Sequence, residues 1–176
     1  MSIKNSYQLF HNELKFHSIY EKLSRPVIIA DNIHSPENMG AILRIAGNIG
    51  ALKSLFISDK IQSLKNHKIN RTSSGGSTKT DWTRITTEEL TTSIPDNYSL
   101  VAIETTFDAQ NIYSFKFPEK TAFIIGNEVN GISDEVLQHA EYKVYIPIPG
   151  PISSLNVTHA LSIAVFEWWR QQTSSF

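Results

Sequence analysis

The 176-residue chain contains no cysteine, and this absence removes several kinds of chemistry. Without thiols it forms no disulfide, no thiolate zinc site and no covalent intermediate on a catalytic cysteine. It also lacks any apolar run near the ~18 residues that indicate a membrane span, and its first 14 residues lack the apolar core of a signal peptide. We therefore expect a cytoplasmic protein.

The two common glycine-rich phosphate loops are also missing. Neither G-x-G-x-x-G nor G-x-x-x-x-G-K-[ST] occurs, so an ordinary dinucleotide or triphosphate site is not expected. Net charge is close to zero, with 16 basic and 17 acidic residues, but the stretch 53–84 carries seven basic residues against two acidic ones. This stretch is either a surface for an anionic partner or a solvated basic loop.

Short apolar runs alternate with helical patterns along the chain. They lie at 27–30, 54–57, 100–103, 122–125 and 142–146. Continuous apolar strands alternating with helices are typical of a parallel sheet that helices cover on both faces. We therefore predict an α/β fold with a mostly parallel sheet, in a single domain spanning 1–176 whose residues 1–25 form an N-terminal helical extension.

A helix is predicted after the first of these strands. Ser35 can cap it, Pro36 suits its first turn, and the helix ends near Gly50. Its apolar stripe comprises Met39, Leu43, Ala46 and Gly50. This stripe places Arg44 away from the buried face, toward solvent, a ligand or a partner.

The last predicted helix, from about Leu155 to Gln171, is apolar nearly all round. One stripe contains Val157, Leu161, Ala164 and Trp168, and the other faces carry Ile163, Phe166 and Trp169. A helix with apolar residues on all faces needs a second cover. That cover is either a second copy of the chain, in a homodimer, or the N-terminal helix.

Ligands of open parallel sheets bind beyond the carboxyl ends of the strands, and three loops there have unusual sequences: 31–38, 126–131 and 147–156. In the second, two glycines surround Glu128, so a backbone can approach a ligand closely, although the segment also suits a helix start. In the third, alternate prolines leave isoleucines around exposed peptide groups. That suits a flat, partly apolar ligand such as adenine, or simply a rigid strand terminator.

Three motifs in these regions together resemble the SpoU branch of the SPOUT RNA ribose methyltransferases. They are N-M-G-A-I-L-R-I-A-G-N-I-G at 38–50, I-G-N-E with G-I-S at 125–133, and I-P with S-L-N-V at 146–157. The resemblance extends from about Pro26 to Arg170. It implies a deep C-terminal trefoil knot, S-adenosylmethionine bound within it, and a homodimer whose two protomers build each site.

The resemblance also implies roles for individual residues. The cofactor would be held largely by backbone groups of Ile103, Glu104, Gly126, Ile146, Ile148 and Leu155, and no metal is expected. Arg44 would be the central catalytic residue, with Asn38, Glu128, Ser154 and Asn156 completing the constellation. Because the pKa of arginine lies at ~12 or above, we expect Arg44 to bind phosphate and stabilise developing negative charge rather than accept a proton.

The segment 71–79, followed by Trp82, resembles the tRNA-modifying members. We predict that Arg71, Lys79 and Trp82 contact RNA, against the alternative of a flexible hairpin. The leading hypothesis is a ribose 2′-O-methyltransferase, with tRNA favoured over rRNA. The rivals are an RNA-binding or assembly protein without turnover and a receiver-like regulatory domain, for which only Asp31 offers a phosphoacceptor.

Overall fold

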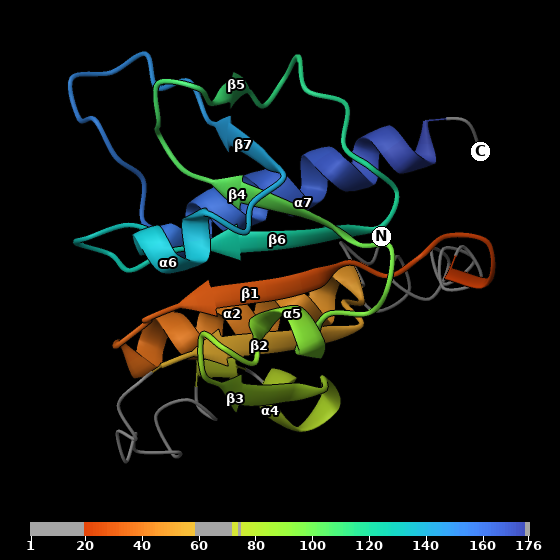
Figure 1. Cartoon of the computed structure of the whole chain (residues 1–176). Helices are drawn as coiled ribbons and strands as arrows, with labels where there is room; N and C mark the ends of the chain where they lie inside the picture. Colours follow the sequence, from red (N-terminus) through yellow and green to blue (C-terminus); the bar gives the residue numbers. More distant parts are fainter. Residues whose placement is uncertain (1–19, 59–71, 74, 175–176) are drawn as a thin grey trace, which may run out of the picture.

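The strands form one parallel sheet (Figure 1). In a computed structural model, which describes residues 20–58, 72–73 and 75–174, the strand order is β3-β2-β1-β6-β4-β7-β5. Every neighbouring pair is parallel. The strands are β1 Val27–Asp31, β2 Lys53–Ile57, β3 Trp82–Ile85, β4 Ser99–Ile103, β5 Gln110–Asn111, β6 Thr121–Ile125 and β7 Tyr142–Tyr145. The predicted parallel α/β sheet is confirmed.

Helices lie on both faces of this sheet (Figure 1). The two long helices, α2 and α7, pack on one face and contact each other, and the short α5 and α6 lie on the other. The named helices are α2 Pro36–Ile49, α4 Gly76–Lys79, α5 Leu90–Ser93, α6 Asp134–Leu137 and α7 Val157–Thr173. Within the described ranges, no helix is long and apolar enough to cross a bilayer.

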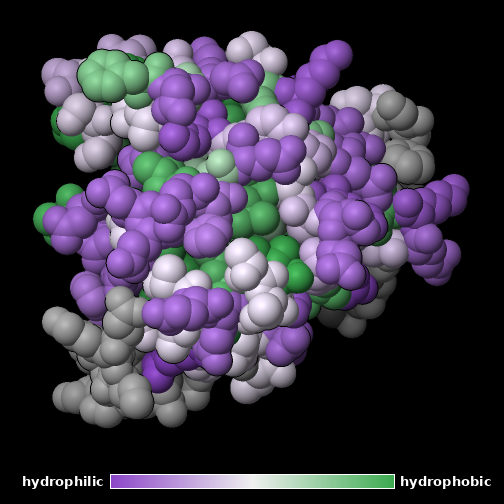
Figure 2. Space-filling view, viewed as in Figure 1, coloured by the Kyte–Doolittle hydropathy of each residue, from purple (hydrophilic) through white to green (hydrophobic). Residues whose placement is uncertain are grey.

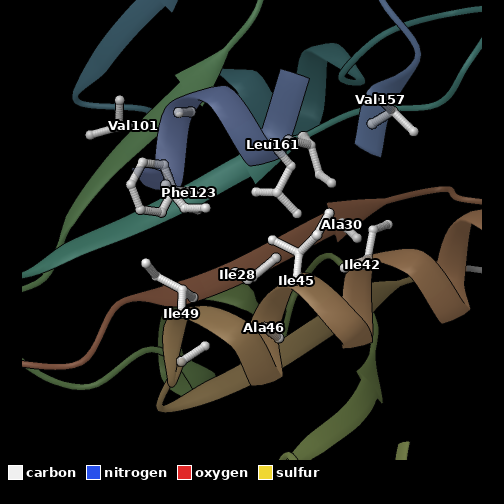
Figure 3. Close-up of a cluster of buried hydrophobic side chains, with 14 of the residues drawn as sticks. Ile28, Ala30, Ile42, Ile45, Ala46, Ile49, Val101, Phe123, Val157 and Leu161 are labelled. Atoms are coloured by element: carbon white, nitrogen blue, oxygen red, sulfur yellow. The ribbon is translucent and has the colours of Figure 1, made fainter. Parts of the chain in front are cut away.

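Burial on both faces explains why the strands read as continuous apolar runs. In β1, Ile28 and Ala30 face α2 and α7, whereas Val27 and Ile29 face the side of α5 and α6 (Figure 3). All four are fully buried, and each large aliphatic side chain buried in this way contributes roughly 1.5–3 kcal/mol. The outer surface seen in Figure 2 is mostly hydrophilic, so the apolar residues are concentrated between the layers.

Helix α2 begins and ends as its sequence predicts. The Ser35 side chain accepts a hydrogen bond from the Asn38 backbone N–H at 3.2 Å, Pro36 is the first helical residue, and Gly50 ends the helix in the left-handed region at φ 67°. The buried face is wider than the predicted stripe because Ile42, Ile45 and Ile49 are also buried. Arg44 is exposed, as predicted.

Two strands and one helix boundary differ from the sequence-based expectation. Strands β3 and β5 were not predicted, because β3 is an edge strand with exposed polar residues and β5 has only two residues. Of the predicted helix at 1–25, residues 1–19 lie outside the described residues. Residues 20–21 form a short 3₁₀ turn and residues 22–26 are not helical, so the predicted helix does not reach Arg25.

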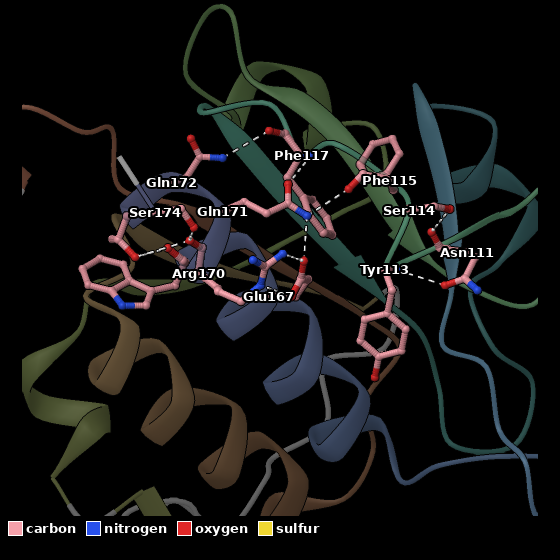
Figure 4. A network of polar contacts seen from close by, with 12 residues as sticks. Asn111, Tyr113, Ser114, Phe115, Phe117, Glu167, Arg170, Gln171, Gln172 and Ser174 are labelled. Atoms are coloured by element: carbon pink, nitrogen blue, oxygen red, sulfur yellow. Dashed lines mark hydrogen bonds and ion pairs between the residues drawn. The ribbon is translucent and has the colours of Figure 1, made fainter. Parts of the chain in front are cut away.

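The end of α7 is tied to the connection between β5 and β6 (Figure 4). Gln171 donates to the Phe115 carbonyl at 2.9 Å and accepts from the Phe117 N–H at 3.0 Å. Gln172 donates to the Phe117 carbonyl, and the Trp168 ring N–H donates to the Pro118 carbonyl. Side chains of α7 therefore make the hydrogen bonds that a neighbouring strand would otherwise make to the backbone of this connection.

Candidate functional site

A cavity of about 230 Å³ opens at the carboxyl ends of β4, β6 and β7. It lies where ligands of open parallel sheets bind. Its walls come from three strand ends, the loop 126–131, the loop after β7 and the first turn of α7. The lining residues are Ile103, Glu104, Thr105, Ile125, Gly126, Asn127, Glu128, Val129, Gly131, Tyr145, Ile148, Ser153, Ser154, Leu155, Val157 and Ala160.

The chemistry of this lining favours a partly apolar, positively charged ligand. Aliphatic side chains make much of the wall, and the two charged residues are Glu104 and Glu128. Among the described residues that line it there is no lysine, arginine or histidine. Such a cavity attracts a cation and provides no side-chain charge for a phosphate group.

The loop 126–131 is a tight backbone structure that requires both of its glycines. Asn127 and Gly131 exchange two backbone hydrogen bonds, of 2.8 and 3.0 Å. Gly131 lies at φ 70°, and a Cβ there would come within 2.5 Å of a Glu104 carboxylate oxygen. A Cβ on Gly126 would lie 2.1 Å from the Gly131 backbone, so a side chain at either position displaces the cavity wall.

Two carboxylates hold this loop to the sheet. Glu104 accepts a hydrogen bond from the Ile132 backbone N–H at 3.0 Å. Asp31 is 1% exposed and accepts from the Ser133 backbone N–H at 2.7 Å. The Asn127 side chain adds a bond to the Asn32 carbonyl at 2.8 Å. The buried Asp31 is therefore a loop anchor, which removes the receiver-like reading.

The rim beside Thr105 is held by a separate ion pair. Lys143 Nζ lies 2.8 Å from an Asp108 carboxylate oxygen, and the Thr106 hydroxyl donates to the other oxygen at 2.7 Å. The hydrogen bond from Lys143 lowers the pKa of Asp108 below its usual value. In the described part of the chain, no three acidic or histidine side chains are grouped closely enough to hold a metal ion.

Four of the five predicted catalytic residues lie together. Asn38, on α2, donates a side-chain hydrogen bond to Glu128. Asn156 caps α7 and donates to the Asn38 side-chain oxygen at 3.5 Å. Glu128 and Ser154 line the cavity directly.

Arg44 is the residue that the structure keeps apart. It lies on the exposed face of α2 and does not line the cavity. Among the described residues, its guanidinium makes no hydrogen bond or ion pair. Its five N–H donors are therefore available to a partner outside this chain.

Five of the six predicted cofactor contacts line the cavity: Ile103, Glu104, Gly126, Ile148 and Leu155. Ile146 does not; it packs against the hydrophobic core on the α2 and α7 side. Asn127 and Gly131, which belong to the second motif, also line the cavity. Sequence reasoning assigned no role to Thr105, Tyr145 or Ser153, which line it too. Thr105 and Tyr145 lie at the ends of predicted strands, so their position at the carboxyl edge was a usable signal.

Two of the three predicted RNA-contacting residues, Lys79 and Trp82, lie within the described residues. Lys79 is exposed at the end of α4, and Trp82 packs edge to face on Phe56 with ring centroids 5.8 Å apart. Arg71 lies outside the described residues. Gly76 is pressed against α2, since a Cβ there would lie 2.6 Å from the Leu43 carbonyl oxygen. Residues 76–79 therefore form a short helix docked beside Arg44.

The fold is similar to that of a solved SpoU methyltransferase, AviRb from Streptomyces viridochromogenes, in complex with the cofactor AdoMet. The TM-score is 0.77 and the identity 26%, over 86% of this chain and 59% of that one. Fold and cavity together define a methyltransferase of the SPOUT class. The model of the SpoU rRNA Methylase family matches residues 25–166, and the chain belongs to this family, which confirms the resemblance found in its motifs.

Two curated relatives cover nearly the whole chain. An uncharacterized tRNA/rRNA methyltransferase of Borreliella burgdorferi is 29% identical over 171 residues, which are 97% of this chain and 74% of the relative. A tRNA (guanosine(18)-2′-O)-methyltransferase of Aquifex aeolicus is 28% identical over 173 residues, which are 94% of this chain and 80% of the relative. The chain thus spans most of these relatives but only 59% of AviRb.

Proposed function

We propose that this protein transfers a methyl group from S-adenosylmethionine to a ribose 2′-hydroxyl of RNA. The observation that carries the proposal is the meeting of three distant motifs at one cavity. Asn38, Glu128 and Asn156 come from different elements and are joined by side-chain hydrogen bonds at its edge. The chain is a member of a family whose relatives are named for methylation of tRNA and rRNA.

The cavity fits the cofactor. Its aliphatic walls suit an adenine ring, its two carboxylates suit the positive charges of a sulfonium and an ammonium group, and backbone groups at three strand ends are within it. Ile103, Gly126, Ile148 and Leu155 would hold the cofactor mainly through their backbones. When bound, it supplies an electrophilic methyl group.

The residues of the chain perform the remaining tasks of binding and orientation. Asn38 and Asn156 each carry a donor and an acceptor, which orient a ribose and the Glu128 carboxylate. The Arg44 guanidinium binds the phosphate next to the target ribose and stabilises the negative charge that develops on the ribose 2′-oxygen as the hydroxyl proton passes to that phosphate. Because Arg44 lies away from the cavity of its own chain, we infer that each site is completed by a second protomer.

Cofactor binding is testable without any RNA. We expect S-adenosylmethionine and S-adenosylhomocysteine to bind in calorimetry, one per chain, with the affinity unchanged by a metal chelator. The expectation follows from a cavity that offers aliphatic walls to the adenine ring, and carboxylates and backbone groups to the ammonium group, which both ligands carry. Absence of a binding signal at millimolar ligand contradicts the proposed cofactor.

An exposed apolar side chain on α7 supports the proposed homodimer. Phe166 is 49% exposed on this helix, whereas Ile163 and Trp169 pack partly against the core. The N-terminal helix, the alternative cover, lies mostly outside the described residues, although Tyr20 contacts Trp169 with ring centroids 5.7 Å apart. Phenylalanine is enriched in interfaces between protein chains, so Phe166 is the residue of this helix that we assign to the proposed dimer surface.

We expect sedimentation at micromolar concentration to show a dimer, and Phe166→Glu to shift it toward monomer because a carboxylate is costly to bury there. Tyr113→Glu is the matched control, since Tyr113 is an exposed aromatic residue on the β5–β6 connection. A wild-type chain that sediments as a monomer contradicts the model of shared sites.

The RNA is identified by mass spectrometry of nucleosides from tRNA and rRNA of a strain lacking the gene. Loss of one 2′-O-methylated nucleoside from tRNA is expected, because the segment 71–79 resembles the tRNA-modifying members. Loss from rRNA alone corrects the RNA class. Unchanged nucleosides in both pools, with cofactor binding also absent, favour an RNA-binding or assembly role.

We also infer the trefoil knot and the single domain from this arrangement. Helix α7 lies under β4 and β6, and its end is bound to residues 115–118, which belong to the connection before β6. One family model spans residues 25–166 without a break. An RNA substrate also favours action in the cytoplasm, where tRNA and rRNA are available.

A further inference from the structure

The Thr158 hydroxyl has a contact that helix formation does not require. Thr158 lies on the first turn of α7 and is 9% exposed. Its hydroxyl donates to Asn156 Oδ1 at 2.6 Å, and that oxygen already accepts the Thr158 backbone N–H at 2.9 Å. The backbone bond alone caps the helix. The second bond occupies the remaining acceptor site of the Asn156 oxygen.

The Thr158 backbone N–H requires the Asn156 oxygen on its side of the amide, and the hydroxyl bond to the same oxygen holds the amide more firmly in that orientation. The Asn156 Nδ2 group is directed to Asn38 Oδ1, at 3.5 Å, and Asn38 Nδ2 in turn donates to Glu128. Every donor in this series of hydrogen bonds points the same way, from Thr158 to the Glu128 carboxylate. Turning either amide over would place an N–H against an N–H, so only one arrangement satisfies all members.

This chain of hydrogen bonds crosses three parts of the fold. Thr158 and Asn156 belong to α7, Asn38 to the first turn of α2, and Glu128 to the loop that lines the cavity. Glu128 and Asn38 are 90 residues apart in the sequence, and Asn156 and Asn38 are 118 apart. A hydroxyl at the start of α7 is thereby connected to a carboxylate at the cavity.

We propose that Thr158 is a positioning residue for the methyl transfer. Its hydroxyl orients the Asn156 and Asn38 amides, and the Asn38 amide in turn holds the Glu128 carboxylate at the cavity as a hydrogen-bond acceptor. The inference rests on the proposed function. It assigns Thr158 no contact with cofactor or RNA, because Thr158 does not line the cavity. Its effect is exerted through the two amides.

The test compares Thr158→Val with Thr158→Ser in the full chain. Valine keeps the volume and the backbone cap but loses the hydroxyl, so we expect kcat for methyl transfer from S-adenosylmethionine to unmodified tRNA to fall about fivefold to tenfold, the worth of one ordinary hydrogen bond. The KM for the cofactor should change little, and the melting temperature should fall by no more than a few degrees, as for any single lost hydrogen bond. Serine retains the hydroxyl and is expected to restore kcat.

A matched control comes from the other end of the same helix. The Thr173 hydroxyl donates to the Trp169 carbonyl at 2.7 Å, so Thr173→Val also removes a threonine hydroxyl from α7 and should leave kcat unchanged. In an Asn38→Ala background, Thr158→Val is expected to lower kcat no further, because the series of hydrogen bonds from Thr158 to Glu128 is already interrupted at residue 38. An equal loss in both backgrounds overturns the proposal.

A second readout needs no activity and separates this inference from the proposed function. We expect Thr158→Val to shift the side-chain amide NMR signals of Asn38, on a different helix, and Thr158→Ser to leave them in place. If the wild type methylates no RNA, the proposed function fails but these signals still decide the chain of bonds. Asn38 signals that do not move in Thr158→Val show that Thr158 only caps α7.

Discussion

Arg44→Ala is expected to lower methyl transfer by at least ~100-fold, the usual cost of removing a group that stabilises charge in a transition state. The fold should be unaffected, because Arg44 is exposed and makes no hydrogen bond or ion pair within the described residues. Calorimetry should return the wild-type affinity for S-adenosylmethionine, since the residue does not line the cavity. The loss is measured as transfer of labelled methyl groups to unmodified tRNA and rRNA.

Arg84→Ala is the matched control. Arg84 is also an exposed arginine, on the edge strand β3, so it tests whether the loss of any surface arginine weakens RNA binding. We expect a change of only a few fold, caused by weaker phosphate attraction. Arg44→Lys should recover little activity, because an ammonium group lacks the paired donors of a guanidinium. Wild-type turnover in Arg44→Ala shows that Arg44 has no role in the reaction.

Gly126→Ala should abolish cofactor binding and destabilise the fold. The new methyl group would lie 2.1 Å from the Gly131 carbonyl carbon and 2.2 Å from the Ile132 nitrogen, and both are backbone atoms that cannot move aside alone. Overpacking of this kind costs roughly 1–3 kcal/mol or more of unfolding free energy. Calorimetry with S-adenosylhomocysteine and a thermal melt measure the two effects.

Gly150→Ala serves as the control for the same substitution in another loop near the site. A Cβ at Gly150 meets no atom within 4 Å, so we expect wild-type stability and affinity. The difference between the two variants therefore reports close packing at Gly126 rather than the general loss of a glycine. A Gly126→Ala protein that binds the cofactor normally means that the loop 126–131 is not part of the binding site.

Local patterns predicted much of the fold because they depend on neighbouring residues. Strands buried on both faces must be apolar throughout, so the five main strands were visible as short apolar runs. Capping of α2 by Ser35 requires a side chain next to the helix start, and it was predicted. The edge strand β3 was missed because its two central residues, Thr83 and Arg84, are exposed and polar and so give no apolar run.

The residue types of the site were also present in the motifs, and the loops that carry them follow predicted strands. Their grouping could be expected only from family resemblance, since no local pattern relates residues 90 or 118 positions apart. Two details escaped even the resemblance. Ile146 packs into the core rather than lining the cavity, and Thr158 bonds to the Asn156 side chain.

The amino-acid sequence by itself determined where five of the seven described strands and the two long helices lie, how α2 begins, and that Arg44 is exposed. These properties follow from side-chain periodicity and from hydrogen bonds within a few residues. Only the tertiary structure decided that Asn38, Glu128 and Asn156 meet while Arg44 remains apart. The physical reason is the strand order, which places β1 beside β6 and so brings Asn38, which follows β1, close to Glu128, which follows β6. Nothing in the sequence of either strand specifies its neighbour.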